Sequence, residues 1–227
     1  MPAPLRRDAE RNRQRILEEA RRLFTETGLG VSHDEIARAA QVGVGTVYRR
    51  FPAKEDLLAA LFTEQVEQVV ALAEAALERS DPADALRDFL AATLEMQARD
   101  RGLRQLLGGT SRPTALARGA RERIAPVVQQ LVERAQAAGT LRADVGVTDI
   151  ALVPLAVGAV LDASRDVDPQ VWRRTLALLL DGLRTAAPVD PLPGRAPSPA
   201  TFERMMSSGS RTPSSSGVAG GGGRTDR

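Results

Sequence analysis

Apolar side chains near the start of the chain follow a helical spacing. They recur at i, i+4, i+7 and i+8, in the order Ile16, Ala20, Leu23 and Phe24. This spacing places side chains on one face of an α-helix. Gly28 follows directly, and a glycine just past a helix end readily adopts the left-handed conformation that stops the helix. The pattern predicts a helix over 8–27 with one buried stripe.

A second, shorter helix is predicted to begin at Ser32. The Ser32 hydroxyl can cap the helix while Glu35 reaches back to the Ser32 backbone, which satisfies two backbone N–H groups at the helix start. A short apolar face follows, made of Ile36, Ala37 and Ala40. Residues 41–45 interrupt the periodicity, and the glycines at 43 and 45 predict a tight turn there.

A third short helix after this turn has two different faces. Val47 and Phe51 are four residues apart and are expected to face the core. The other side chains face elsewhere; they are Thr46, Tyr48, Arg49 and Arg50. A hydroxyl, a phenol and two guanidinium groups on one exposed helix suit phosphate oxygens and base edges. Residues 32–51 therefore predict a helix-turn-helix that binds DNA.

The chain from residue 53 to residue 186 is predicted to be helical, with no strand pattern and no repeat. The expected helices are 53–79, 81–101, 113–138 with a kink at Pro126, 149–165 and 169–186, and a short helical piece between Gly102 and Gly108. Thr148 and Asp168 are the expected caps of the last two helices. The final helix carries an apolar stripe that suits either a core or a subunit interface: Trp172, Leu176, Leu179, Leu180 and Leu183.

The composition changes after Pro188 to Pro, Gly, Ser and Arg, with four consecutive glycines at 220–223. Such a segment buries too little apolar surface to offset its chain entropy, so disorder is expected. We predict an all-α protein with an N-terminal three-helix helix-turn-helix DNA-binding headpiece over 1–55. A C-terminal helical domain is expected over 56–187, and a disordered Pro/Gly/Ser-rich tail over 188–227.

The composition argues against most enzymatic chemistry. The 227 residues include no cysteine and one histidine, His33, which leaves no thiolate nucleophile and no His-cluster metal site. Glu95 or Asp162 could in principle do acid–base work, but nothing places them in a catalytic spacing. No catalytic residue, cofactor or metal is predicted, and we expect a protein that is not an enzyme.

The distribution of charge is more informative than the net charge of +2. Residues 1–55 carry eleven Lys/Arg against eight Asp/Glu, a balance of +3, whereas 56–187 carry fifteen against eighteen, a balance of −3. The basic excess lies where the helix-turn-helix lies. The N-terminus lacks a signal-type apolar core, and the longest apolar run, 150–161, is shorter than the roughly 18 residues of a membrane span. We expect a cytoplasmic, nucleoid-associated protein with no membrane partner.

The segment from Ser32 to Leu58 resembles the TetR family of bacterial transcriptional regulators. The family's usual wording is close to Gly-Val-Ser-x-Gly-Thr-Leu-Tyr-x-x-Phe-x-x-Lys-x-x-Leu, and this chain reads Gln41-Val42-Gly43-Val44-Gly45-Thr46-Val47-Tyr48-Arg49-Arg50-Phe51-Pro52-Ala53-Lys54-Glu55-Asp56-Leu57. The resemblance implies DNA contacts, and the candidate residues are His33, Val44, Gly45, Thr46, Tyr48, Arg49, Arg50 and Lys54.

The chain departs from the family pattern at the start of the third helix. Gly43 replaces the usual capping Ser, which is expected to cost the helix a few tenths of a kcal/mol. Val44 and Gly45 offer no hydrogen-bonding side chain, so base reading is expected from contact with thymine methyl groups and from the polar side chains that follow. Asp34 is acidic where some relatives place a basic DNA contact, which puts that contact in doubt.

The resemblance also implies a homodimer, made by the last two helices, and an inducer pocket among the middle helices. Two headpieces on one rigid body add their contacts to a palindrome, which supports the dimer independently. The candidate interface residues are Trp172, Leu176, Leu179, Leu180 and Leu183. The resemblance thus makes 56–187 a ligand-binding and dimerisation domain. The candidate pocket residues, a set of the kind that is more often ordinary core, are Phe89, Leu94, Met96, Leu106, Ile124 and Val128.

The function predicted from these observations is a repressor that binds a palindromic DNA operator as a dimer. A small apolar or amphipathic ligand would release it by favouring a headpiece spacing that no longer fits two half-sites. Two alternatives belong to other classes: a helical small-molecule-binding enzyme or carrier, and a sequence-nonspecific architectural DNA-binding protein. The sequence does not identify the ligand, the operator or the regulated genes, and it does not distinguish a repressor from an activator.

Overall fold

The computed structural model describes residues 3–28, 30–99, 114–185 and 191–208. The helices within these ranges are α1 (Ala3–Thr27), α2 (His33–Ala39), α3 (Val44–Arg50), α4 (Lys54–Leu77), α5 (Pro82–Arg99), α7 (Thr114–Ala137), α8 (Val147–Ser164), α9 (Val171–Leu183) and α10 (Pro199–Ser208). The β pairing described in these ranges is one isolated antiparallel bridge, between Leu141 and Arg184. The predicted all-α fold is confirmed. The helical piece expected between Gly102 and Gly108 lies outside the described residues.

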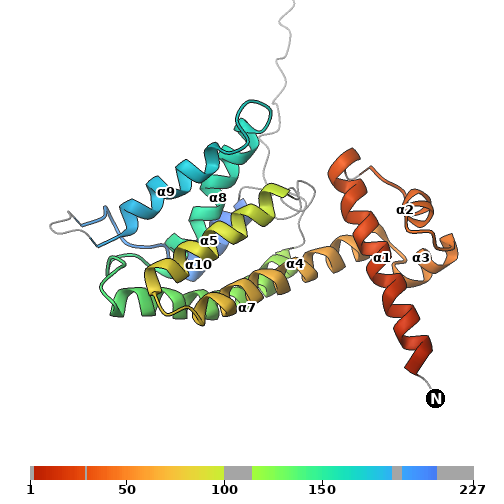
Figure 1. The fold of residues 1–227 in the computed structure, drawn as a ribbon, viewed down its shortest axis with the longest axis horizontal. Helices are drawn as coiled ribbons and strands as arrows, with labels where there is room; N and C mark the ends of the chain where they lie inside the picture. Colours follow the sequence, from red (N-terminus) through yellow and green to blue (C-terminus); the bar gives the residue numbers. More distant parts are fainter. Residues whose placement is uncertain (1–2, 29, 100–113, 186–190, 209–227) are drawn as a thin grey trace, which may run out of the picture.

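The helices build two hydrophobic clusters that share α4 (Figure 1). The first, which we call the headpiece core, joins α1, α2 and α3 to the first turns of α4 through Leu57 and Leu61. The second, the body core, joins α5, α7, α8 and α9 to the rest of α4 through Val69 and Ala73. The helix α4 is therefore part of both the headpiece and the body.

Helix ends near the headpiece follow local backbone chemistry. Gly28 has φ +82° and its N–H bonds the Phe24 carbonyl at 3.0 Å, so the predicted stop of α1 is confirmed. The turn between α2 and α3 is formed differently from the prediction. Its left-handed residue is Gln41, with φ 54°, whereas Gly43 has φ −64° and Gly45 lies inside α3. A non-glycine residue in this conformation costs of order 1 kcal/mol.

The helix α8 is the most apolar of the body. It is 18 residues long with a mean hydropathy of 1.6, which satisfies the length and composition of a membrane-crossing helix. Val153, Val157 and Leu161 nevertheless lie in the body core. One third of this window is buried inside the body, and a core helix of a folded protein can meet the same criteria.

The C-terminal segment corrects the prediction of disorder. Residues 199–208 form α10, and Phe202 is buried at 8 % exposure. The preceding residues return to the body because the Thr148 hydroxyl donates to the Pro197 carbonyl at 2.7 Å and the Leu192 N–H donates to Asp144 Oδ2 at 2.9 Å. Thr148 is therefore not the cap of α8, which begins after Gly146. Residues 186–190 and 209–227 lie outside the described residues.

Candidate nucleic-acid interface and ligand cavity

The helix α3 presents one face to the headpiece core and the other to solvent. Val47 is fully buried, while Tyr48 is 48 % exposed and Val44 is 40 % exposed. Gly45, Arg49 and Arg50 are also exposed, and Thr46 is half-buried. A Cβ atom added at Gly45 would meet nothing within 4 Å. The exposed side of α3 is thus open to a partner along its whole length.

The histidine of α2 supports this face through the tyrosine. The rings of His33 and Tyr48 stack with centroids 4.7 Å apart and planes 13° apart. His33 Nε2 lies 3.0 Å from the Phe51 carbonyl oxygen, which can only accept, so Nε2 carries the hydrogen. This geometry lets His33 position the Tyr48 ring, and contact of His33 with DNA stays a prediction.

Basic residues around α3 differ in how firmly they are held. Arg50 lies 3.7 Å from Glu10 of α1, and the ammonium of Lys54 lies 5.6 Å from the ring centroid of Phe24. The ion pairs of the described residues include none for Arg49. Of the two arginines on α3, Arg50 therefore has an ion pair within the described residues and Arg49 has none.

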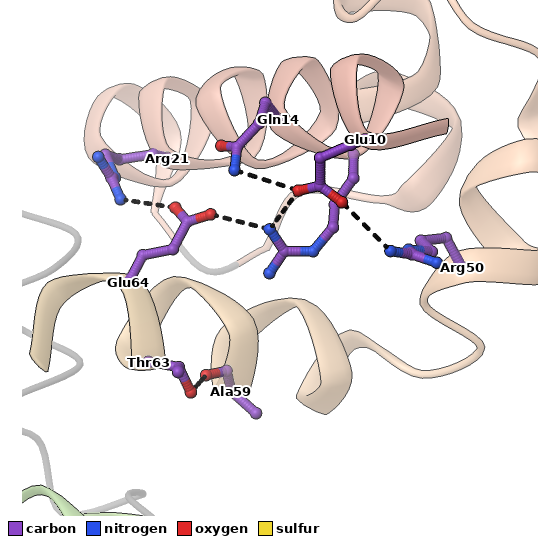
Figure 2. A network of polar contacts seen from close by, with 8 residues as sticks. Glu10, Gln14, Arg21, Arg50, Ala59, Thr63 and Glu64 are labelled. Carbon is purple, nitrogen blue, oxygen red and sulfur yellow. Dashed lines mark hydrogen bonds and ion pairs between the residues drawn. The ribbon is translucent and has the colours of Figure 1, made fainter. Parts of the chain in front are cut away.

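A polar network joins α3 to α4 across α1 (Figure 2). Glu10 accepts from Arg13 at 3.3 Å and pairs with Arg50. Glu64 of α4 then pairs with both Arg13, at 3.3 Å, and Arg21, at 3.2 Å. The Glu64 side chain is 18 % exposed, so these pairs are partly shielded from water. The network fixes the headpiece against α4 from two points on α1.

The start of α2 is capped by reciprocal hydrogen bonds. The Ser32 N–H donates to Glu35 Oε2 at 2.8 Å, and the Glu35 N–H donates to the Ser32 hydroxyl at 3.3 Å. The predicted capping box is confirmed. The hydrogen bonds from Ser32 hold the pKa of Glu35 below its usual range. By contrast, Gly43 provides no side-chain hydrogen bond at the start of α3.

The body encloses a cavity of about 940 Å³ between α4, α5, α7, α8 and α10. Among the predicted pocket residues, Phe89, Ile124 and Val128 line it. Leu94 is instead fully buried in the body core, since it faces the packed side of α5. Met96 lines a different groove, between α1, α4 and α5. Leu106 lies outside the described residues.

Two buried polar side chains in the cavity wall were not predicted. Gln65 is 1 % exposed, and neither its amide nitrogen nor its amide oxygen has a partner in the described part of the chain. The Thr93 hydroxyl, in a residue 5 % exposed, is also unpartnered there. The sequence held a signal for Gln65: it interrupts a buried stripe of α4 at four-residue spacing, Leu57, Leu61, Gln65, Val69 and Ala73.

The helix α10 forms the outer wall of the cavity. Pro199, Ala200 and Phe202 line it from this side. Glu203 accepts a hydrogen bond from Arg121 of α7 at 2.5 Å, which holds the pKa of Glu203 below its usual range. Ala196 approaches so closely that a Cβ at Gly146 would lie 2.8 Å from it. The C-terminal segment is thus a packed part of the body.

The predicted dimer stripe is divided between core and surface. Trp172 and Leu176 are 2 % and 4 % exposed within the single chain, because they face the body core. These two residues have almost no area left for a partner, and their assignment is corrected. Leu180 and Leu183 are half-buried against the same core, whereas Leu179 is 37 % exposed. Leu178, which the stripe left out, is 63 % exposed.

Acidic residues and the histidine do not assemble a metal site in the part of the chain that the structure covers. No group of three or more His, Cys, Asp or Glu residues there could hold a metal ion. Glu95 is engaged by arginines, Arg173 at 3.0 Å and Arg99 at 3.3 Å, which hold its pKa below its usual range. A carboxylate paired in this way is a poor general base.

Family models match both parts of the chain. Residues 16–61 match the model of bacterial regulatory proteins of the TetR family. Residues 81–185 match the C-terminal domain of SbtR-like transcriptional regulators. Neither match reaches α10.

Individual relatives give the same result. Helix-turn-helix transcriptional regulators of Staphylococcus aureus are 48 % identical over 54 residues, a stretch that spans 23 % of this chain and 29 % of theirs. A TetR regulatory protein from Mycobacterium vanbaalenii is similar over its whole length and 80 % of this chain, at 38 % identity and a TM-score of 0.62. A TetR regulator from Streptomyces coelicolor covers 77 % of this chain, at 31 % identity and a TM-score of 0.60. The chain belongs to the TetR family of bacterial transcriptional regulators.

Proposed function

We propose that the chain is a dimeric repressor that binds a palindromic operator through α3 and leaves it when a small molecule enters the body cavity. The observation that carries the DNA-binding part is the two-faced α3, with Val47 buried and Tyr48, Val44 and Arg49 exposed. A short helix with this division suits the major groove, where one face packs on the protein and the other meets base edges. Such a regulator acts in the cytoplasm, on the nucleoid.

The contacts of the helix-turn-helix divide by chemistry. Arg49, Arg50 and Lys54 supply positive charge for phosphates. Tyr48 and Thr46 supply hydroxyl groups, and Val44 supplies a methyl-bearing surface at the start of α3. Gly45 leaves room for close approach of the DNA, because a Cβ there meets nothing within the protein. His33 acts through Tyr48.

The dimer surface we propose lies on α8 and α9. Leu178 and Leu179 of α9 are large apolar residues that the single chain leaves exposed, at 63 % and 37 %, and Leu155 of α8 is 46 % exposed but also lines the cavity. An antiparallel pair of helices with exposed apolar residues can form a four-helix bundle with its copy, through one self-complementary patch. Two headpieces would then be held at a fixed spacing.

The helix α4 provides the connection between cavity and headpiece. Phe62, Gln65 and Val66 line the cavity, and Glu64, between them, pairs with Arg13 and Arg21 of α1. A molecule that displaces this part of α4 therefore moves the residues that fix the headpiece. The ligand would shift the equilibrium away from the headpiece spacing that binds the operator. The size of this shift is set by how much more tightly the ligand binds the other spacing.

The test of the DNA-binding part is selection of duplexes from a random library, followed by footprinting of the selected site. We expect a protected palindrome whose half-sites lie a whole number of helical turns apart, about 10 base pairs each. Uniform coverage would indicate an architectural DNA-binding protein instead. No protection would indicate a carrier or enzyme of TetR fold.

The connection through α4 is tested by Glu64→Gln, which removes both ion pairs with little change in size. We expect operator affinity to fall three- to tenfold, because partly shielded ion pairs of this kind contribute about 1 kcal/mol. Glu74→Gln is the matched control, since Glu74 lies exposed on the same helix. Equal affinities for the two variants would contradict this role of Glu64.

A further inference from the structure

We propose that the body cavity binds a mainly apolar molecule carrying one uncharged hydrogen-bonding group, and that Gln65 and Thr93 bind this group. The regulatory role of this binding rests on the proposed function, but the binding itself does not, because it can be measured without DNA. The helix α10 forms part of the same site.

The first argument is the cost of the two unpartnered side chains. A buried amide or hydroxyl without a hydrogen bond destabilises a fold, so such groups are almost always paired. Gln65 offers a donor and an acceptor from a residue that is 1 % exposed, and Thr93 adds a hydroxyl. A group that completes these hydrogen bonds would recover the lost free energy on binding.

The second argument is their placement on neighbouring helices. The helices α4 and α5 pack against each other around a short turn (Figure 1). Gln65 lies 12 residues before the end of α4 at Leu77, and Thr93 lies 11 residues after the start of α5 at Pro82. The two residues thus lie at similar heights along the helix pair, and both line the same cavity. We call these two side chains the polar spot.

The third argument is the character of the remaining wall. The residues around the spot are apolar, chiefly Phe62, Val66, Val69, Phe89, Leu90 and Ile150. The charged residues in the wall are two arginines, Arg118 and Arg121, and three acids, Glu122, Asp162 and Glu203. Arg121 is already paired with Glu203. The Nε of Arg121 is buried without a hydrogen bond in the described residues, but the charge of Arg121 is matched by Glu203. The other charged residues of the wall are exposed, so the wall favours an uncharged molecule.

The size of the cavity agrees with a small organic molecule. About 940 Å³ lies at the upper end of the usual range for ligand pockets, roughly 300–1,000 Å³. The helix α10 covers one side of the cavity, and the polar spot would orient a bound molecule.

The experiment uses the full-length protein and four probes that share a ten-carbon chain. Decanamide and decan-1-ol are uncharged, decanoate is an anion and decylammonium is a cation. Affinities are measured by displacement of the apolar dye N-phenyl-1-naphthylamine and by the shift in unfolding temperature. We expect the two uncharged probes to bind at least tenfold more tightly than either ion. Equal or tighter binding of an ion, or no binding of any probe, would overturn the proposal.

Two variants connect the preference to the named residues. Gln65→Leu and Thr93→Val should each weaken decanamide about five- to tenfold and leave the affinity for the dye nearly unchanged. Both should also raise the unfolding temperature of the free protein, because an unpartnered polar group is removed. Gln68→Leu is the control, since Gln68 is exposed on the same helix and does not line this cavity.

The outcomes for the variants and for the repressor are separable. Unchanged decanamide affinity in Thr93→Val and Gln65→Leu would overturn the assignment, even if the protein binds its operator. Normal probe binding in a protein that protects no DNA would leave the cavity assignment standing and reject the repressor. Thr93→Val exchanges a hydroxyl for a methyl group of about the same size. This variant therefore tests the proposal even if Gln65→Leu fails to fold.

Discussion

Replacement of His33 by alanine tests whether this residue positions Tyr48 or contacts DNA itself. The substitution removes a hydrogen bond to the Phe51 carbonyl and a stacked ring at 4.7 Å. Each contact contributes about 1 kcal/mol, and alanine returns about 0.5 kcal/mol through its helix propensity. The expected net loss is about 1.5 kcal/mol, or about 3–6 °C in the unfolding temperature of a chain of this size.

The assay combines unfolding of the free protein with operator binding by fluorescence anisotropy. If His33 acts through Tyr48, His33→Ala weakens binding in the wild-type background and has little further effect in Tyr48→Ala, because the ring it positions is gone. The salt dependence should not change with the substitution. A charged phosphate contact would lower the salt slope by about 0.9 per half-site. An unchanged unfolding temperature with additive losses in the double variant would refute the positioning role.

Three further results are expected. Gly43→Ser should raise the unfolding temperature by about 1–2 °C because it restores a cap to α3, and the added Cβ meets only Thr46 Oγ1 at 3.7 Å; a lower temperature would contradict the assigned helix start. Glu203→Gln should speed hydrogen exchange in residues 191–208. Because the pKa of Glu203 is lowered, its ion pair with Arg121 stabilises α10 fully above the ordinary pKa of a glutamate and is lost as the pH falls through the lowered value. On acidification the protection of these amides, corrected for the intrinsic exchange rate, should therefore fall in wild type but not in Glu203→Gln. Leu178→Glu should convert the dimer to a monomer in sedimentation experiments while leaving the protomer folded, since Leu178 is 63 % exposed. A dimer that persists in this variant would show that the interface lies elsewhere.

Local signals predicted the headpiece well. The capping box at Ser32 and the stop at Gly28 depend on residues within four positions of each other, and both are confirmed. The burial of Val47 and Phe51 follows from their four-residue spacing alone. The turn was harder, because glycine is only one of the residues that can adopt a left-handed conformation, and here Gln41 adopts it.

Features of the body that depend on long-range packing were not predictable in the same way. Trp172 and Leu179 lie on one helix and look alike in a periodic pattern, but one faces the protomer core and the other solvent. The composition after residue 188 indicated disorder, yet Phe202 is buried and Glu203 pairs with Arg121, so α10 packs against the body. Arg121 lies 82 residues earlier in the chain.

The central claim, that α3 reads DNA, is tested most directly by operator affinity of the double variant Tyr48→Ala, Arg49→Ala. Both side chains are exposed, so the free protein should keep its dimer and lose only the few degrees that the ring contact of Tyr48 with His33 contributes. Two lost contacts in each of two half-sites, at about 1 kcal/mol each, predict a loss of roughly a thousandfold. Arg174→Ala, an exposed arginine on α9, is the control and should bind as wild type does. An operator affinity of the double variant equal to that of this control would contradict the account.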